Sequence, residues 1–262
     1  MARYFVRLKL RLILNALRSG RGAVGLVAGF LFAVPFVIAG FGIFAFAARD
    51  EVAWAREIAV VGFTLLFLGW VLLPVIGFGS DETLDPSRLA LLPLTRSRMV
   101  AGLTAASCVG IPPLATLAVL SGTVVGYARG AATVVVAAAV AVELLLCVVA
   151  SRAVVTALSR RLRSRKSRDA IIVGVTLFAL SLQAISFMQG NLPAAVSGAV
   201  VRRVAGVLAW TPPGLAGRAV AEAGDGRLPA ALAAVGAVAL AVLALAGHAR
   251  APEPGSLGGD SA

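Results

Sequence analysis

Long uninterrupted runs of apolar residues dominate this chain and leave few folds open to it. The first run extends from near Gly22 to Ala48, and others of comparable length follow. A run of 18 or more apolar residues with few charges is long enough to cross a bilayer as a helix. Hydrophobic residues make up 60% of the chain, whereas a soluble domain is roughly 45–50% apolar. The sequence therefore predicts an all-α membrane protein.

Six apolar stretches are candidate spans and predict a six-span helical bundle over residues 22–247. The predicted spans are about 23–47, 58–78, 99–125, 131–157, 170–189 and 228–247. The first run exceeds the roughly 7–15 residues of a signal-peptide core, so we expect it to be retained. Pro112 and Pro113 are expected to interrupt the third span. Residues 248–262 are rich in Gly, Pro and Ser and predict a disordered cytoplasmic tail.

The segment 1–21 has the spacing of an amphipathic helix. At 100° per residue its polar side chains share one face: Arg3, Arg7, Arg11, Asn15 and Arg18. Such a helix lies on a membrane surface and is attracted to anionic lipid. An ordinary basic flank of the first span is the alternative.

The positions of the charges explain why the chain is so basic. Its formal net charge is +12, which in other contexts points to nucleic acid. Here the basic residues concentrate in 1–21, 79–98 and 158–169, which lie on one side of the membrane if the spans alternate. Cytoplasmic segments carry such an excess. We therefore expect both termini in the cytoplasm of a bacterium and no nucleic-acid partner.

Several catalytic groups are missing from the sequence. The single histidine, His248, leaves no Ser-His-Asp triad in the spans and no multi-histidine metal site. Neither Lys9 nor Lys166 lies in a glycine-rich phosphate loop. Cys108 and Cys147 fall in apolar runs and fit small buried side chains. We therefore expect no enzyme activity and no cofactor or metal in this chain.

The polar segment 79–98 carries signals for one short helix. Asp85 can cap a helix whose first residue is Pro86, and the helix then stops before Pro93. Acidic residues precede this helix and arginines follow it. It can dock into a groove on a cytoplasmic partner, or it is a well-capped loop without a partner.

The segment 190–227 is only partly apolar. Trp210 precedes Pro212, Pro213 and Gly214. We expect these three residues to separate two short helices. Such a pair fits a re-entrant or interfacial hairpin on the outer side, with Trp210 at the interface. A surface amphipathic loop is the alternative.

Two features inside the predicted spans concern function and packing. Glu143 lies near the middle of the fourth span, where an acid is costly and marks a polar path or a bond to a neighbouring helix. The spacings Gly25/Gly29 and Gly122/Gly126 allow helices to approach closely.

The layout resembles the permease subunit of a bacterial type-2 ABC exporter. Four features carry the resemblance: a basic amphipathic helix before the first span, a capped helix between spans two and three, six spans, and a broken outer segment before the last span. The stretches DETLDPSRLALLPL (81–94) and WTPPGLAGRA (210–219) are similar to those of such permeases.

The resemblance implies a mechanism and partners. Two permease units, identical or different, form the substrate path, and a separate ATPase subunit that holds ATP and Mg binds the inner face. The helix in 79–98 becomes the coupling helix in the bacterial cytoplasmic membrane. The match assigns the coupling contact to six residues: Asp85, Pro86, Arg88, Leu89, Leu91 and Leu92.

One departure and two alternatives accompany the resemblance. Similar permeases are often about twice this length, so the chain fits a half-size unit that dimerises or a truncated copy. An ion-gradient-driven secondary transporter would use Glu143. A non-transporting membrane scaffold would need neither an ATPase nor an ion site.

Overall fold

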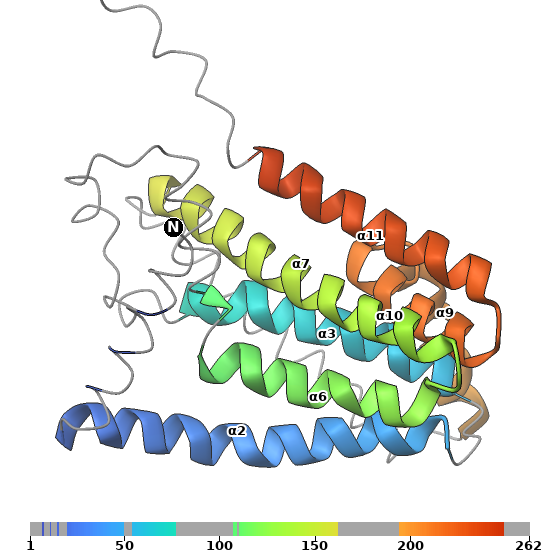
Figure 1. Ribbon diagram of the computed structural model, residues 1–262, viewed down its shortest axis with the longest axis horizontal. Helices are drawn as coiled ribbons and strands as arrows, with labels where there is room; N and C mark the ends of the chain where they lie inside the picture. The colour runs from blue at the N-terminus through green and yellow to red at the C-terminus, as the bar shows by residue number, and fades with distance from the viewer. Residues whose placement is uncertain are drawn as a thin grey trace, which may run out of the picture.

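The computed structural model describes residues 20–49, 54–76, 107–108, 110–161 and 194–248, together with Arg7, Arg11 and Asn15. All regular structure in this part of the chain is helical, as predicted (Figure 1). The helices are α2 (Gly20–Ala47), α3 (Ala55–Ile76), α6 (Ile111–Tyr127), α7 (Ala132–Arg161), α9 (Ala194–Leu208), α10 (Pro212–Gly224) and α11 (Leu228–His248).

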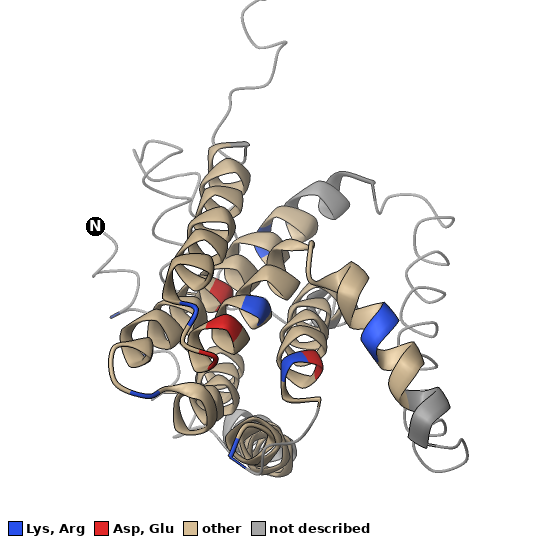
Figure 2. Cartoon of the chain, turned by 90° about the vertical axis from the view of Figure 1, so that its right-hand side faces the viewer, with Lys and Arg blue, Asp and Glu red and all other residues tan. Residues whose placement is uncertain are grey.

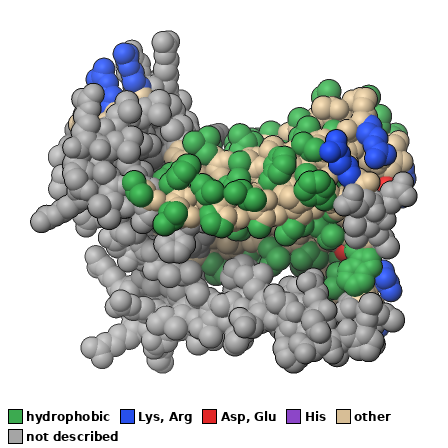
Figure 3. All heavy atoms as spheres, turned by 90° about the horizontal axis from the view of Figure 1, so that it is seen from below, with side chains coloured by type: hydrophobic (Ala, Val, Ile, Leu, Met, Phe, Trp, Pro, Cys, Tyr) green, Lys and Arg blue, Asp and Glu red, His purple; other side chains and the backbone are tan. Residues whose placement is uncertain are grey.

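Four of these helices are long and apolar enough to cross a membrane. The qualifying stretches are Gly29–Ala47, Ala55–Leu72, Ala132–Val155 and Leu228–Gly247. Large apolar side chains such as Leu31 and Leu240 point outward, and hydrophobic side chains cover the middle of the face in Figure 3. The chain is therefore a multi-helix membrane protein. Helix α6 is a shorter apolar helix, and the predicted span 170–189 lies outside the described residues.

The described helices alternate in direction, so several connections meet at one end of the bundle (Figure 1). We call this the polar end and define it as residues 48–49, 54–57, 128–131 and 209–227. Figure 2 looks onto it and shows charged residues of both signs at the helix ends. The last residues of α3 and the first residues of α6 lie at the opposite end (Figure 1).

The core forms where α6 and α10 fit among the longer helices. Helix α6 packs on α2 and α7, and α10 packs on α3, α7 and α11. Phe44 meets Phe63 edge to face, with ring centroids 5.8 Å apart. A Cβ atom at Gly122 or Gly126 would lie 2.4 Å from a backbone carbonyl oxygen of α2. The predicted close packing at this glycine pair is confirmed, because only a residue without Cβ fits there.

The interruption that Pro112 and Pro113 predict in the third span is present, and it lies just before them. Residue 107 is helical, residues 108 and 110 lie in a turn and a bend, and the two prolines occupy the first turn of α6, which begins at Ile111. Proline suits this position because the backbone N–H groups of a first helical turn have no partner in the helix. Gly110 precedes the helix with φ 152°, a backbone conformation that favours glycine.

The two short helices predicted in 190–227 are present as α9 and α10, and the break between them lies at 209–211. Pro212, Pro213 and Gly214 follow the break and form the first turn of α10. The Thr211 hydroxyl caps the helix by accepting a hydrogen bond from the Gly214 N–H, with a separation of 3.3 Å. A Cβ atom at Gly214 would lie 1.8 Å from the Leu208 carbonyl oxygen. Glycine therefore permits the tight turn from α9 into α10.

Candidate functional site

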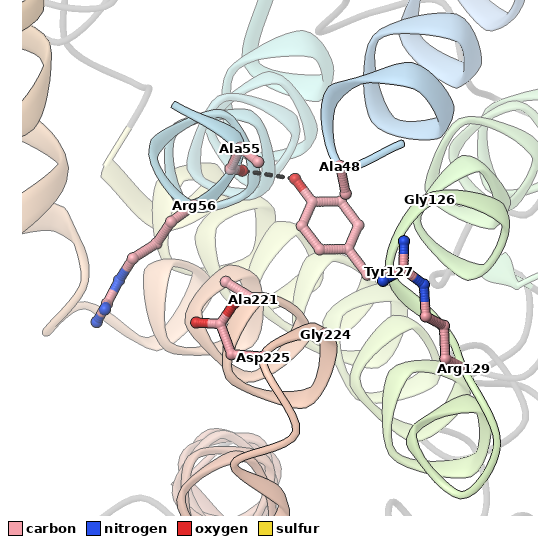
Figure 4. Close-up of a pocket in the computed structure, with 9 residues that line it drawn as sticks. All are labelled: Ala48, Ala55, Arg56, Gly126, Tyr127, Arg129, Ala221, Gly224 and Asp225. Atoms are coloured by element: carbon pink, nitrogen blue, oxygen red, sulfur yellow. Dashed lines mark hydrogen bonds between the residues drawn. The ribbon is translucent and has the colours of Figure 1, made fainter. Parts of the chain in front are cut away.

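The polar end contains a hollow of about 230 Å³ to which several elements contribute (Figure 4). Tyr127 at the end of α6 is buried, and its hydroxyl donates a 2.5 Å hydrogen bond to the Ala55 carbonyl oxygen at the start of α3. Arg129 and Asp225 also line the hollow, and Arg56 extends away from the tyrosine (Figure 4). The tyrosine therefore fixes α6 against α3 at this end of the bundle.

Glu222, in the last turns of α10, is the centre of an ion-pair cluster. Only 3% of its side chain is exposed. Its Oε1 atom lies 3.2 Å from Nη2 of Arg56 and 3.4 Å from Nε of Arg218. Its Oε2 atom lies 2.8 Å from Nε of Arg227. One buried carboxylate thus connects α3, α10 and the residue that precedes α11.

The same cluster is reinforced around Arg227. Its backbone N–H donates a 2.8 Å hydrogen bond to the Glu222 carbonyl oxygen, and its guanidinium donates to the Asp225 carboxylate. The hydrogen bond to Asp225 and the charge of Glu222 raise the pKa of Arg227 above its ordinary value. The arginine therefore stays charged, and the cluster carries three cations against two carboxylates.

A second hollow, of about 420 Å³, lies between α3, α9 and α10, and we call it the arginine groove. Its charged lining consists of Arg56, Arg202, Arg218 and Glu57, and Trp210 also lines it. The Arg218 guanidinium carbon lies 5.5 Å from the centroid of the Trp210 ring, a cation–π contact. Trp210 itself is 76% exposed. The groove thus combines surplus positive charge with an exposed aromatic side chain.

Glu143 is fully buried in α7, far from the polar end along the helix. The thiol of Cys147, one helical turn later, donates a weak hydrogen bond to the Oε1 atom of Glu143, with a separation of 3.7 Å. Its Oε2 atom has no hydrogen-bond partner in the described part of the chain. The sequence therefore identified an acid inside a predicted span, and the structure shows that its side chain is buried.

Other predicted residues lie wholly or partly outside the described ranges. All six coupling candidates fall there, since residues 77–106 are not described. In the segment 1–21, Arg7, Arg11 and Asn15 are helical and exposed, and the interfacial position of this segment stays a prediction. Within the described ranges, no group of His, Cys, Asp and Glu could hold a metal ion.

Sequence reasoning missed the Glu222 cluster. Arg218 and Glu222 are four residues apart on one helix, a spacing that places two side chains on the same face. That local signal was present in the sequence. Arg56 is 166 residues from Glu222 along the chain, so no local pattern predicts this contact.

No protein-family model, curated protein or solved structure matches this chain. Composition and helix lengths show a multi-helix membrane protein with four candidate spans. The likeness to ABC permeases rests on the quoted sequence features alone.

Proposed function

We propose that this chain is the permease subunit of an ATP-driven ABC exporter, which forms the substrate path and couples to a separate ATPase subunit. One observation carries the proposal. The broken pair α9–α10 lies at the same end as the connections that follow α2 and α6, whereas α3 ends at the opposite end (Figure 1). This is the arrangement expected if 79–98 faces a cytoplasmic partner and 209–227 faces outward.

Two of the six predicted spans are described only in part or not at all. Spans 99–125 and 170–189 bring the total to six, with both termini in the cytoplasm of a bacterium. A second permease unit completes the path. ATP and Mg are bound by the ATPase. The coupling segment, residues 79–98, contacts it through the six residues that the resemblance assigns: Asp85, Pro86, Arg88, Leu89, Leu91 and Leu92.

The Glu222 cluster supports a mechanical role for α3 in this proposal. Helix α3 leads from the polar end directly into the coupling segment. At the polar end Arg56 of α3 is held by Glu222 of α10, and α10 also packs along α3. A push on the cytoplasmic end of α3 would therefore move α10 and α11 with it, since packed helices move as rigid elements.

Co-purification of a partner tests the proposal. The full chain is isolated from its native membrane in mild detergent, as wild type and as the double variant Leu89→Asp/Leu91→Asp. We expect an ATPase with a phosphate-binding loop to accompany the wild type and to be lost from the variant. Leu257→Asp, in the tail expected on the same side, is the control and should keep the ATPase. Absence of any ATPase from the wild type contradicts the proposal.

A gradient-driven transporter is the second candidate, and Glu143 favours it. A fully buried acid in a span, with one carboxylate oxygen lacking a hydrogen bond in the described part of the chain, can bind a proton or cation. This reading predicts transport without an ATPase that Glu143→Gln abolishes. Export that stops when the ATPase is removed and persists in Glu143→Gln argues against it. A non-transporting scaffold would show no export that depends on an ATPase and no transport that depends on Glu143.

A further inference from the structure

Among the residues that the structure describes, the arginine groove has more positive than negative side chains. Arg56 and Arg218 share the single carboxylate of Glu222. No carboxylate lies within ion-pair distance of Arg202 among the residues that the structure describes. Glu57 is the one acid that lines the groove. Three arginines thus lie near two acids, Glu57 and Glu222, and Glu222 also pairs with Arg227, so the excess positive charge attracts an anion.

The floor and rim of the groove are apolar. Val60, Ala205 and Ala209 are buried against one another below the arginines. Trp210 stands at the rim and is 76% exposed, as expected of an aromatic side chain at a membrane–water interface. A ligand for this groove would therefore combine an anionic group with an apolar body.

We propose that the arginine groove binds the phosphate group of an anionic amphiphile, with the apolar part of the ligand against α9 and Trp210. Arginine suits this ligand because its planar guanidinium donates paired hydrogen bonds to phosphate oxygens. The volume of about 420 Å³ lies within the usual range of small-molecule sites. The inference does not rest on the proposed function, since a groove of this kind binds its ligand whether or not an ATPase is present.

Two adjacent arginines on α9 provide a matched test. Gly198, Ala205 and Ala209 repeat at helical spacing along α9 and are buried. Arg202 lies on the same face of the helix. Trp54 lies against this face, because its ring would be 2.8 Å from a Cβ atom at Gly198. Arg202 and Arg203 are both exposed, and only Arg202 lines the groove. The two variants Arg202→Gln and Arg203→Gln therefore remove the same charge from the same helix, and only one of them changes the groove.

The outward face beside Arg203 makes the control stringent. Its neighbours Val200, Val204 and Val207 are exposed apolar residues. A general attraction of anionic lipid to α9 would depend on Arg203 as much as on Arg202. A specific phosphate site would depend on Arg202 alone.

Binding is measured by titrating the purified full chain in detergent with phosphatidylglycerol and counting bound lipid by native mass spectrometry. We expect Arg202→Gln to weaken binding about tenfold, the loss of one charge-assisted hydrogen-bonding group, and Arg203→Gln to stay within about twofold of the wild type. Arg202→Lys should recover part of the affinity. Equal loss in the two glutamine variants, or no loss in either, overturns the proposal.

Further ligands distinguish the source of the phosphate. Phosphatidylcholine, whose headgroup is zwitterionic, should bind the wild type less tightly than phosphatidylglycerol, and equal binding overturns the claim that charge selects the ligand. Inorganic phosphate and glycerol phosphate should fail to displace bound phosphatidylglycerol at millimolar concentration. If either displaces it, the groove takes a soluble phosphate and the amphiphile proposal is wrong.

Discussion

Two buried carboxylates in this protein have opposite surroundings. Glu143 in α7 and Glu222 in α10 are 0% and 2% exposed. Glu143 has one weak hydrogen bond from a thiol on its own helix. Glu222 lies in ion-pair distance of three arginines that come from two helices and the start of a third. The first acid lies along an apolar span and the second lies at the polar end.

This difference in ion-pair partners indicates that Glu222 has a structural role and that Glu143 is the candidate for a functional one. A buried ion pair becomes strongly destabilising when one partner is removed, because an uncompensated charge is left behind. Glu222 is therefore expected to hold the polar end together. Glu143 has no ion-pair partner in the described ranges, so its removal should cost little stability, and any effect on transport would be separable from folding.

Glu222→Gln is expected to have the largest effect. It leaves Arg56, Arg218 and Arg227 without their shared carboxylate and should lower the free energy of unfolding by about 3 kcal/mol. This is the low end of the range for a broken buried pair, because the arginines reach solvent. Unfolding in mixed detergent micelles measures it. Asp225→Asn, at an exposed acid, is the control and should cost less than about 1 kcal/mol.

Gly217→Ala tests whether close helix packing positions the cluster. A Cβ atom there would lie 2.5 Å from the Ala59 carbonyl oxygen and 2.7 Å from the Val60 Cα atom. Helix α10 must then move away from α3, at a cost of about 2 kcal/mol. Gly236→Ala on α11 meets nothing within 4 Å and should be neutral or stabilising. Equal stability of the two variants would show that the close contact is unimportant.

Arg56→Gln should have a smaller effect, about 1 kcal/mol, because 45% of this side chain is exposed and solvent screens the pair. Its effect should not add to that of Glu222→Gln in a double-mutant cycle, since the two residues are partners. Arg129→Gln, at an exposed arginine outside the Glu222 cluster, is the control. Strict additivity of Arg56→Gln and Glu222→Gln would mean that their contact contributes nothing.

Glu143→Gln should have the smallest effect on stability, less than about 1 kcal/mol, because glutamine keeps the size and shape of the side chain and no ion pair among the described residues is lost. The same unfolding assay measures it beside Glu222→Gln. A loss of unfolding free energy as large as that of Glu222→Gln would contradict this difference between the two acids. It would indicate that Glu143 has a partner among the residues outside the described ranges.

The elements that could be predicted from the sequence depend on local patterns. Apolar runs reveal helices α2, α3, α7 and α11 because span length is fixed by bilayer thickness. The four-residue spacing of Gly122 and Gly126 reveals a face on which a neighbouring helix can pack closely, and α2 occupies it. An acid inside an apolar run is equally visible, which is why Glu143 was identified.

Other features depend on contacts that no local pattern encodes. Pro112 and Pro213 each predict a break in a helix, and each lies in the first turn after that break, so the sequence locates the break only to within a few residues. The Glu222 cluster joins residues from 56 to 227, which only the folded bundle brings together. The arginine groove likewise needs α3, α9 and α10 in place.

The proposed function requires that the two ends of the bundle face opposite sides of the membrane, with the arginine groove outside and the segment 79–98 inside. Labelling of single cysteines in intact cells with a membrane-impermeant maleimide tests it most directly, in a background without Cys108 and Cys147. Trp210→Cys should be labelled in intact cells and Ser80→Cys only after permeabilisation. Labelling of both in intact cells, or the reverse pattern, would contradict the claim.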